Sequence, residues 1–99
     1  MYFLTQESEL KIIDNIQVLY FYHAKFPFHQ KFLIMIEKIQ KSRSDILFSA
    51  IDTDYFKTLC KRFTVDRVPT VLILKNGKEI KRINNLVTSE TFKNTFDDI

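Results

Sequence analysis

The sequence has very little of three residue types that often define a fold or a site. It contains one cysteine, one glycine and two prolines among 99 residues. A single cysteine excludes an internal disulfide, and it excludes any zinc site that needs two or more cysteines. So little glycine and proline excludes collagen-like and linker-rich chains, and it leaves no glycine-rich loop to hold a phosphate. We expect no metal and no cofactor.

Long apolar runs, an export signal and a strong excess of one charge are also missing. The longest apolar runs, residues 18–22 and 32–36, are far shorter than the ~20 residues that span a bilayer. The N-terminus has no basic start and includes Glu7, unlike a secretory signal. The net charge is only +3, which gives no reason to expect a nucleic-acid partner. With one unpaired cysteine, these features predict a cytoplasmic protein without a membrane partner.

The sequence does contain enough apolar material for one core. Hydrophobic residues make up 45% of the chain and aromatic residues 14%. A chain of this length buries roughly two-thirds of its unfolded surface on folding, so disorder is excluded. We expect one domain, residues 1–99.

Apolar spacing in the first half of the chain predicts alternating strands and helices. Residues 2–4 are expected to form a short edge strand, and Thr5 to cap a helix whose apolar residues are Leu10, Ile13 and Ile16. Residues 18–22 form a continuous apolar run, typical of a central strand covered on both faces. Pro27 suits the first turn of a long helix. Its inward stripe would be Phe28, Phe32, Met35, Ile36 and Ile39.

The second half continues the alternation and ends in a hairpin and a helix. A buried strand is expected at 46–51, followed by a short amphipathic helix that carries Phe56, Leu59, Cys60 and Phe63. Residues 71–74 and 79–83 flank Asn76-Gly77, the strongest local signal for a two-residue hairpin turn. Thr88 or Ser89 can cap a last helix with Phe92, Phe96 and Ile99 on its buried face. The order β-α-β-α-β-α-β-β-α predicts an α/β fold, a three-layer α/β/α sandwich with a mixed central sheet.

One segment resembles the thioredoxin family closely. The segment is Val65-Asp66-Arg67-Val68-Pro69-Thr70-Val71-Leu72-Ile73-Leu74-Lys75-Asn76-Gly77-Lys78. It resembles the family's Val-Pro-Thr loop, the strand after it and the Lys-Asn-Gly turn, in order and at the usual spacing. Ile51-Asp52-Thr53-Asp54 resembles the strand end before the family's third helix. The resemblance runs from about Leu10 to the C-terminus and implies the thioredoxin fold.

The resemblance implies that the peptide bond before Pro69 is cis. In the family this bend turns the backbone of the preceding residue, here Val68, toward a groove. The N–H and C=O of Val68 would then pair with an extended peptide, as in strand addition. The alternative is a trans bond, with Pro69 merely ending one helix and starting a strand.

The cysteine pair that carries the family's redox chemistry is absent from this sequence. Dithiol exchange needs Cys-x-x-Cys at the N-terminus of the long helix. By the resemblance, Phe26 and His29 stand at the two cysteine positions, and Tyr20 stands at the position of a buried acid. A phenol, with an ordinary pKa near ~10, cannot serve the same proton transfer at neutral pH. We predict that this chain alone carries out no dithiol–disulfide exchange.

Cys60 is the only thiol and has two interpretations. On the apolar face of its predicted helix it would be a small, inert core residue. The alternative is a reactive monothiol, which requires an exposed Cys60.

The two histidines also have two interpretations. His29 in a first helical turn would be kept neutral by the helix dipole and could bind a ligand or metal. However, His23 and His29 without a nearby carboxylate make a poor metal site. We expect His29 to be a partly exposed residue that fills the place of a cysteine.

A binding surface is predicted where these segments meet. We call the surface made of Phe26, Pro27, Phe28, His29, Val68, Pro69, Asn84 and Asn85 the predicted groove. Helix periodicity points Phe28 inward and leaves Phe26 facing solvent, unless both rings pack into the core. Asn85 stands where the family often has glycine, and asparagine tolerates a positive φ.

These observations predict a redox-inactive thioredoxin-like domain that binds or scaffolds a protein or peptide partner through the predicted groove. The alternative is a thiol-redox protein that works through Cys60 or through a partner's cysteine. A third hypothesis is a folding helper that holds unfolded peptides without oxidising them.

Overall fold

A five-stranded sheet forms the centre of the fold, described over residues 1–99 by a computed structural model. The strands are β1 (Tyr2–Phe3), β2 (Ile16–Tyr22), β3 (Leu47–Asp52), β4 (Thr70–Lys75) and β5 (Lys78–Ile83). Their spatial order is β1-β3-β2-β4-β5. The first three are parallel, whereas β4 is antiparallel to both of its neighbours. This confirms the predicted mixed sheet.

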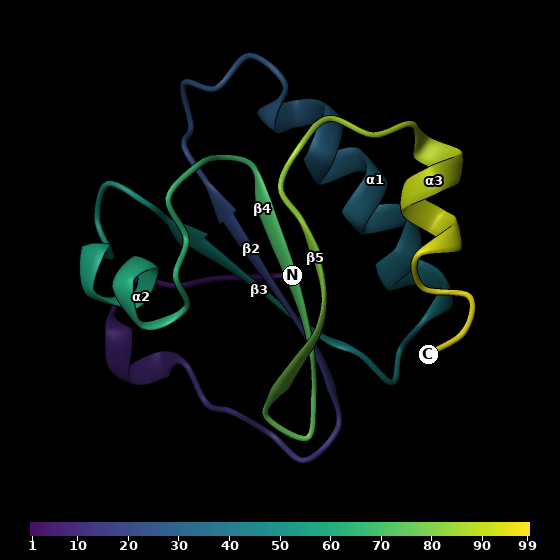
Figure 1. Ribbon diagram of the computed structural model, residues 1–99, viewed down its shortest axis with the longest axis horizontal. Coiled ribbons are helices and arrows are strands. Elements are labelled where there is room, and N and C mark those ends of the chain that lie inside the picture. The colour runs from purple at the N-terminus through teal and green to yellow at the C-terminus, as the bar shows by residue number, and fades with distance from the viewer.

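Helices cover both faces of the sheet (Figure 1), which confirms the three-layer sandwich. α1 (His29–Ser42) and α3 (Ser89–Asn94) pack on one face, and α2 (Lys57–Arg62) packs on the other. Alternate residues of β2 enter different cores, with Tyr20 on the α1 side and Phe21 on the α2 side. None of the three helices has the length and apolarity needed to cross a membrane.

The helix expected after Thr5 is not formed, so that prediction is wrong. The structure has only a single 3₁₀ turn there, η1 (Glu7–Glu9), and Ile16 begins β2. The reason is the fully buried Gln17, whose side chain donates to the Lys11 carbonyl (2.7 Å) and accepts from the Ile13 N–H (3.3 Å). These two bonds hold residues 11–13 outside a helix, because a helix would use the same backbone groups internally.

The hairpin between β4 and β5 forms as predicted. Asn76 and Gly77 have φ values of 52° and 81°. Positive φ at both central positions is characteristic of a type I′ turn, which favours this residue pair.

The loop that leads to Pro69 is anchored from two sides. Thr64, with φ of 55°, ends α2 in the left-handed conformation, and the Val65 N–H donates to the Cys60 carbonyl (2.8 Å). The Arg82 guanidinium of β5 donates to the carbonyls of Phe63 (2.7 Å) and Thr64 (2.8 Å). The start of this loop is therefore tied to the last strand of the sheet.

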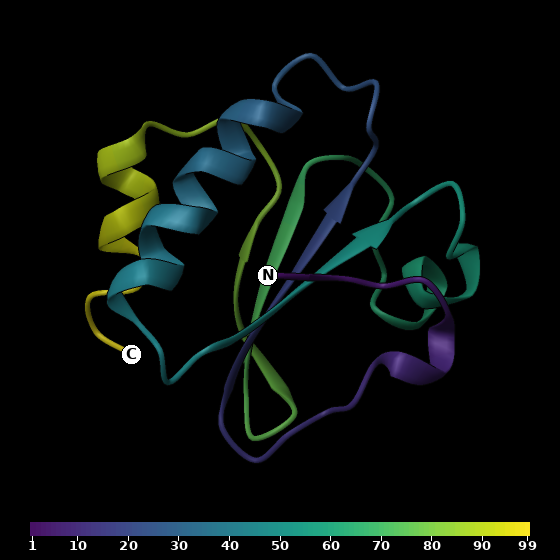
Figure 2. The ribbon, with the colours of Figure 1, turned by 180° about the vertical axis from the view of Figure 1, so that it is seen from behind.

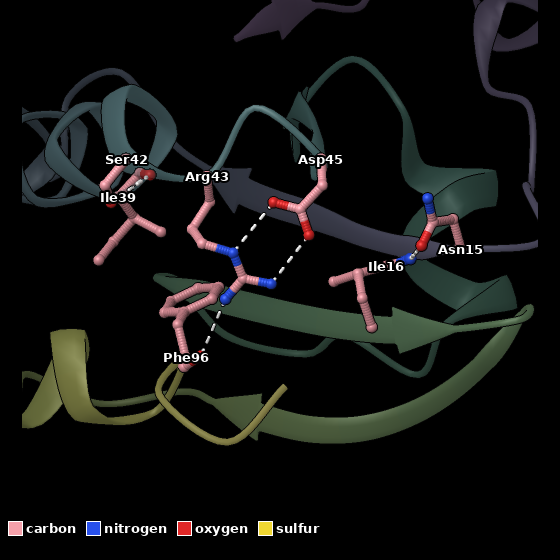
Figure 3. Close-up of polar contacts among 7 residues, drawn as sticks. All are labelled: Asn15, Ile16, Ile39, Ser42, Arg43, Asp45 and Phe96. Carbon is pink, nitrogen blue, oxygen red and sulfur yellow. Dashed lines mark hydrogen bonds and ion pairs between the residues drawn. The ribbon is translucent and has the colours of Figure 1, made fainter.

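An arginine joins α1 to the C-terminal segment, as Figure 3 shows. Nε and Nη2 of Arg43 donate to the two carboxylate oxygens of Asp45, at 3.0 and 2.9 Å, and Nη1 donates to the Phe96 carbonyl at 3.0 Å. The guanidinium holds the pKa of the Asp45 carboxyl below its usual value. The planar fork of arginine suits this three-point contact, which a lysine could not reproduce.

Candidate functional site

Three connecting loops lie at one end of the sheet. Phe21 is in register with Thr70, and Val71 with Ile83, across the antiparallel ladders. The carboxyl ends of β2 and β5 therefore lie at the same end as the start of β4. Figures 1 and 2 show the connections at residues 23–28 and 84–88 at this end, and the connection at 63–69 rising from α2 to the start of β4 at the same end. All residues of the predicted groove come from these connections or from the first residue of α1.

The Val68–Pro69 peptide bond is cis, in agreement with the resemblance. Pro69 and Thr70 are buried, whereas Val68 is partly exposed. The Thr70 hydroxyl donates to the Arg67 carbonyl (2.7 Å) and so closes the bend. Neither the N–H nor the C=O of Val68 pairs with another group of the chain. The loop therefore presents one free donor and one free acceptor on a fixed backbone.

A cavity of about 330 Å³ opens beside Val68 on the α2 side of the sheet. Its lining consists of Thr53, Asp54, Lys57, Cys60, Val65, Asp66, Arg67 and Val68. Sequence reasoning placed Val68 near a binding surface but missed the polar residues around it. Asp66 and Arg67 directly precede Val68, so the resembling segment itself could have identified them.

Cys60 lines the same cavity and is only partly buried, rather than enclosed in the core. Its Sγ lies 3.9 Å from the Thr53 carbonyl. Burial raises the pKa of the Cys60 thiol, and the nearby Lys57 ammonium opposes this only in part. The thiol is therefore protonated at neutral pH, the form in which cysteine is a weak nucleophile.

The structure reverses the expected roles of Phe26 and Phe28. Phe28 is 43% exposed, whereas Phe26 is partly buried, and their ring centroids lie 5.8 Å apart. The helical conformation begins only at His29, so Phe28 is the capping residue, with φ −100° and ψ 11°. His29 takes the inward position that periodicity assigned to Phe28. The exposed aromatic ring of the predicted groove is therefore Phe28, and Pro27 beside it is exposed too.

His29 is buried, which contradicts the expectation of a partly exposed side chain. It is 7% exposed and its ring stacks on Tyr22 (4.7 Å between centroids) and on Tyr20 (5.7 Å). Its Nδ1 lies 2.8 Å from the phenol oxygen of Tyr20, the only partner of that buried hydroxyl. Because an unpaired buried O–H is costly, we infer that Tyr20 donates to Nδ1 and that Nε2 carries the histidine proton.

The environment of this pair keeps both residues neutral. Burial raises the pKa of Tyr20. Burial lowers the pKa of His29, and the Asp52 carboxylate opposes that shift only in part. The pair therefore acts as a polar contact in the core between the sheet and α1, and neither side chain ionises at neutral pH.

The free energy of unfolding is expected to fall on acidification because of His29. The unfolded chain takes up the histidine proton near about pH 6.5, above the lowered pKa in the folded chain. The contribution of His29 to stability is thus full above this pH and declines as the pH falls toward the lowered pKa of the folded chain, with a slope of at most about 1.4 kcal/mol per pH unit. Urea unfolding at several pH values from about 7.5 to 5.5 measures this slope.

Two variants test the assignment of this slope. Tyr20→Phe retains a buried His29 and should retain the decline, whereas Tyr20→Phe combined with His29→Phe should abolish it. The carboxyls with lowered pKa, such as Asp45 and Asp98, change the stability only at lower pH. The reason is that the pKa values of these carboxyls in the unfolded chain lie near about 4. An unchanged slope in the double variant contradicts the assignment.

His23 has a carboxylate partner, contrary to expectation. Its Nε2 lies 2.8 Å from the Asp54 carboxylate, and its Nδ1 accepts the Lys25 N–H at 3.0 Å. The bond between residues 23 and 54 joins the loop after β2 to the loop after β3. No group of three or more histidine, cysteine or acidic side chains in the structure is placed to hold a metal ion.

Asn84 and Asn85 are exposed in the connection after β5. Asn85 does not use the positive φ that asparagine tolerates, since the only residues other than glycine with positive φ are Thr64 and Asn76. Neither asparagine lines the cavity beside Val68. Their part in the predicted groove rests on their place at the same end of the sheet.

Comparison of the sequence with models of known protein families shows which family the chain belongs to. The model of the thioredoxin family matches residues 4–98. This chain belongs to the thioredoxin family. Among solved structures, the oxidized thioredoxin O2 of Arabidopsis thaliana has a TM-score of 0.89 at 20% identity, covering 99% of this chain and 92% of that one. The oxidized mitochondrial thioredoxin 3 of Saccharomyces cerevisiae has a TM-score of 0.85 at 20% identity, covering 100% and 95%. At such identities these similarities show the fold.

Two individual thioredoxins match half of the chain in sequence. Thioredoxin-2 of Saccharomyces cerevisiae is 35% identical over 49 residues, which are 50% of this chain and 47% of that protein. Thioredoxin H-type 1 of Nicotiana tabacum is 31% identical over 49 residues, 50% of this chain and 39% of that protein. The match thus spans less than half the length of these relatives.

Proposed function

We propose that residues 1–99 form one cytoplasmic module that binds a protein or peptide partner without dithiol chemistry. The observation that carries the proposal is the unpaired N–H and C=O of the partly exposed Val68. An extended peptide can satisfy both groups at once by adding one strand-like segment to this backbone. The single cysteine supports the absence of dithiol exchange.

Two neighbouring features support peptide binding at this place. The cavity of about 330 Å³ beside Val68 has room for a side chain of the bound peptide. The exposed ring of Phe28 lies at the same end of the sheet and can cover an apolar residue of the partner. Aromatic residues of this kind often dominate the binding energy of an interface.

Phe28→Ala is expected to weaken binding of a peptide selected from a library of extended peptides by about tenfold or more. The reason is the loss of the exposed ring from the predicted groove. Isothermal titration calorimetry with the selected peptide measures the change in Kd.

Leu47→Ala is the matched control for this experiment. Leu47 is 41% exposed, close to the 43% of Phe28, but it begins β3 and so lies at the opposite end of the sheet. The control should bind the peptide like the unmodified chain. Equal affinity of Phe28→Ala and Leu47→Ala counts against the predicted groove.

A thiol-redox function through Cys60 or a partner's cysteine is the second candidate. The observation that favours it is the partial exposure of Cys60 in the cavity beside Val68. The raised pKa of the thiol speaks against it. Cys60→Ser separates the two candidates, because the binding module keeps its affinity for the selected peptide and a thiol-dependent protein loses its activity.

A further inference from the structure

A second, smaller pocket lies at the carboxyl ends of the three parallel strands. It has a volume of about 270 Å³ and is lined by Leu4, Thr5, Tyr22, Asp52, Tyr55 and Phe56. Tyr22 and Asp52 are in register at the ends of β2 and β3, and Leu4 directly follows β1. It shares no lining residue with the cavity beside Val68. Ligands of open α/β sheets bind outside the carboxyl ends of parallel strands.

Three aromatic rings contribute to the wall of this pocket. Tyr22 is held in place by stacking on His29 and by an edge contact with Phe3 at 5.8 Å between ring centroids. Tyr55 is 80% exposed, the most exposed large hydrophobic residue of the chain. Its ring lies 5.7 Å from that of Phe56, at 48°. At this separation the two rings touch each other, so a small group can lie against them but not between them.

The only charged side chain in the lining is a carboxylate. Oδ1 of Asp52 accepts the N–H groups of Asp54 (2.9 Å) and Tyr55 (3.4 Å), which fix the carboxylate. Oδ2 has no hydrogen-bond partner, and Asp52 forms no ion pair with any cationic side chain. Burial, with a smaller contribution from Asp52, raises the pKa of Tyr22, so its phenol is neutral.

We propose that this pocket binds a methylated ammonium group. The faces of aromatic rings attract cations, and the recognition of quaternary ammonium by several rings is the established use of this effect. Asp52 supplies the opposite charge and repels anions. A methylated ammonium suits the rings better than a bare one, because an unmodified lysine ammonium is strongly hydrated. The volume lies below the range of about 300–1,000 Å³ of drug-sized ligand sites, and so it suits a head group.

The experiment is a titration of the ¹⁵N-labelled chain with tetramethylammonium chloride, followed by amide chemical shifts at constant ionic strength. The expected result is a saturable shift at Tyr55 and Phe56 with a Kd in the millimolar range. Tyr55→Ala and Asp52→Asn should each weaken binding by about tenfold or more, since about 1.4 kcal/mol corresponds to that factor. Asparagine retains an oxygen that accepts the two N–H groups, so the loop should keep its conformation.

Two matched variants separate the pocket from general aromatic or surface effects. Tyr55→Phe keeps the ring face and should bind like the unmodified chain. Tyr2→Ala removes another ring that is 50% exposed but does not line the pocket, and it should also bind normally. Titrations with choline and with a trimethyl-lysine peptide then identify the source of the group. Tighter binding of choline indicates a small free amine, and tighter binding of the peptide indicates a modified protein side chain.

The proposal is overturned if tetramethylammonium causes no saturable shift at Tyr55, or if Tyr55→Ala binds as well as the unmodified chain. It does not rest on the peptide-binding function. A negative titration with intact binding of the selected peptide therefore removes this site alone.

Discussion

The chain is expected not to accelerate the reduction of insulin disulfides by dithiothreitol. A dithiol catalyst forms a mixed disulfide through one cysteine and resolves it with a second. The resemblance places Phe26 and His29 at the two cysteine positions, and the only thiol of the chain, Cys60, has a raised pKa. The rate of insulin precipitation with the chain should equal that with dithiothreitol alone, whereas a Cys-x-x-Cys thioredoxin should raise it severalfold or more.

Cys60→Ser gives the control for residual thiol chemistry. The variant and the unmodified chain should behave identically in the insulin assay, because neither holds a resolving cysteine. Turnover by the unmodified chain that Cys60→Ser abolishes would establish the second candidate function.

Phe32→Ala is expected to lower the free energy of unfolding by about 3–5 kcal/mol. Phe32 is fully buried between Tyr20 and Phe92, with ring centroids 6.2 Å from each. Its removal leaves a cavity in the centre of the core under α1. The loss is a large part of the roughly 5–15 kcal/mol that stabilises a typical domain. Urea unfolding measures it, and the thermal midpoint should fall by more than about 10 °C.

Phe28→Ala is the matched control, one helical turn earlier. Because Phe28 is 43% exposed, its truncation should change the free energy of unfolding by less than about 0.5 kcal/mol. A similar loss from both variants would show that Phe28 packs in the core and is not available to a partner.

The parts of the fold that were predicted correctly depend on local patterns. The continuous apolar run of β2 is typical of a strand covered on both faces, and Asn76-Gly77 suits one kind of turn. The segment around Pro69 is also local, since its order and spacing are shared with the family. These signals need no knowledge of distant contacts.

The absence of the helix expected after Thr5 could not be predicted from apolar spacing, because it depends on the burial of Gln17 in β2. Leu10, Ile13 and Ile16 have helical spacing, but Gln17 binds the backbone at Lys11 and Ile13. The burial of one polar side chain in the strand that follows can thus override a helical pattern in a short segment.

The errors in the candidate site have a similar cause. A shift of one residue in the start of α1 exchanges Phe28 for His29 on the inward face, and periodicity cannot locate a helix end so closely. The bond between Tyr20 and His29 results from the packing of α1 on β2, and the partial exposure of Cys60 results from the packing of α2 beside the loop before Pro69. The pocket at Tyr55 likewise combines the last residues of β2 and β3 with residues from the connections after β1 and after β3.

We propose that the backbone of Val68 pairs with an extended peptide although the two thiols of a thioredoxin are absent. The surface at which a selected peptide contacts the chain tests this proposal most directly. Amide chemical shifts of the ¹⁵N-labelled chain, recorded during titration with the peptide, locate the contact. We predict that the largest changes fall on Val68, its neighbour Arg67 and the loop that holds Phe28. Saturating binding that shifts other surfaces and leaves the Val68 amide unchanged would contradict the account.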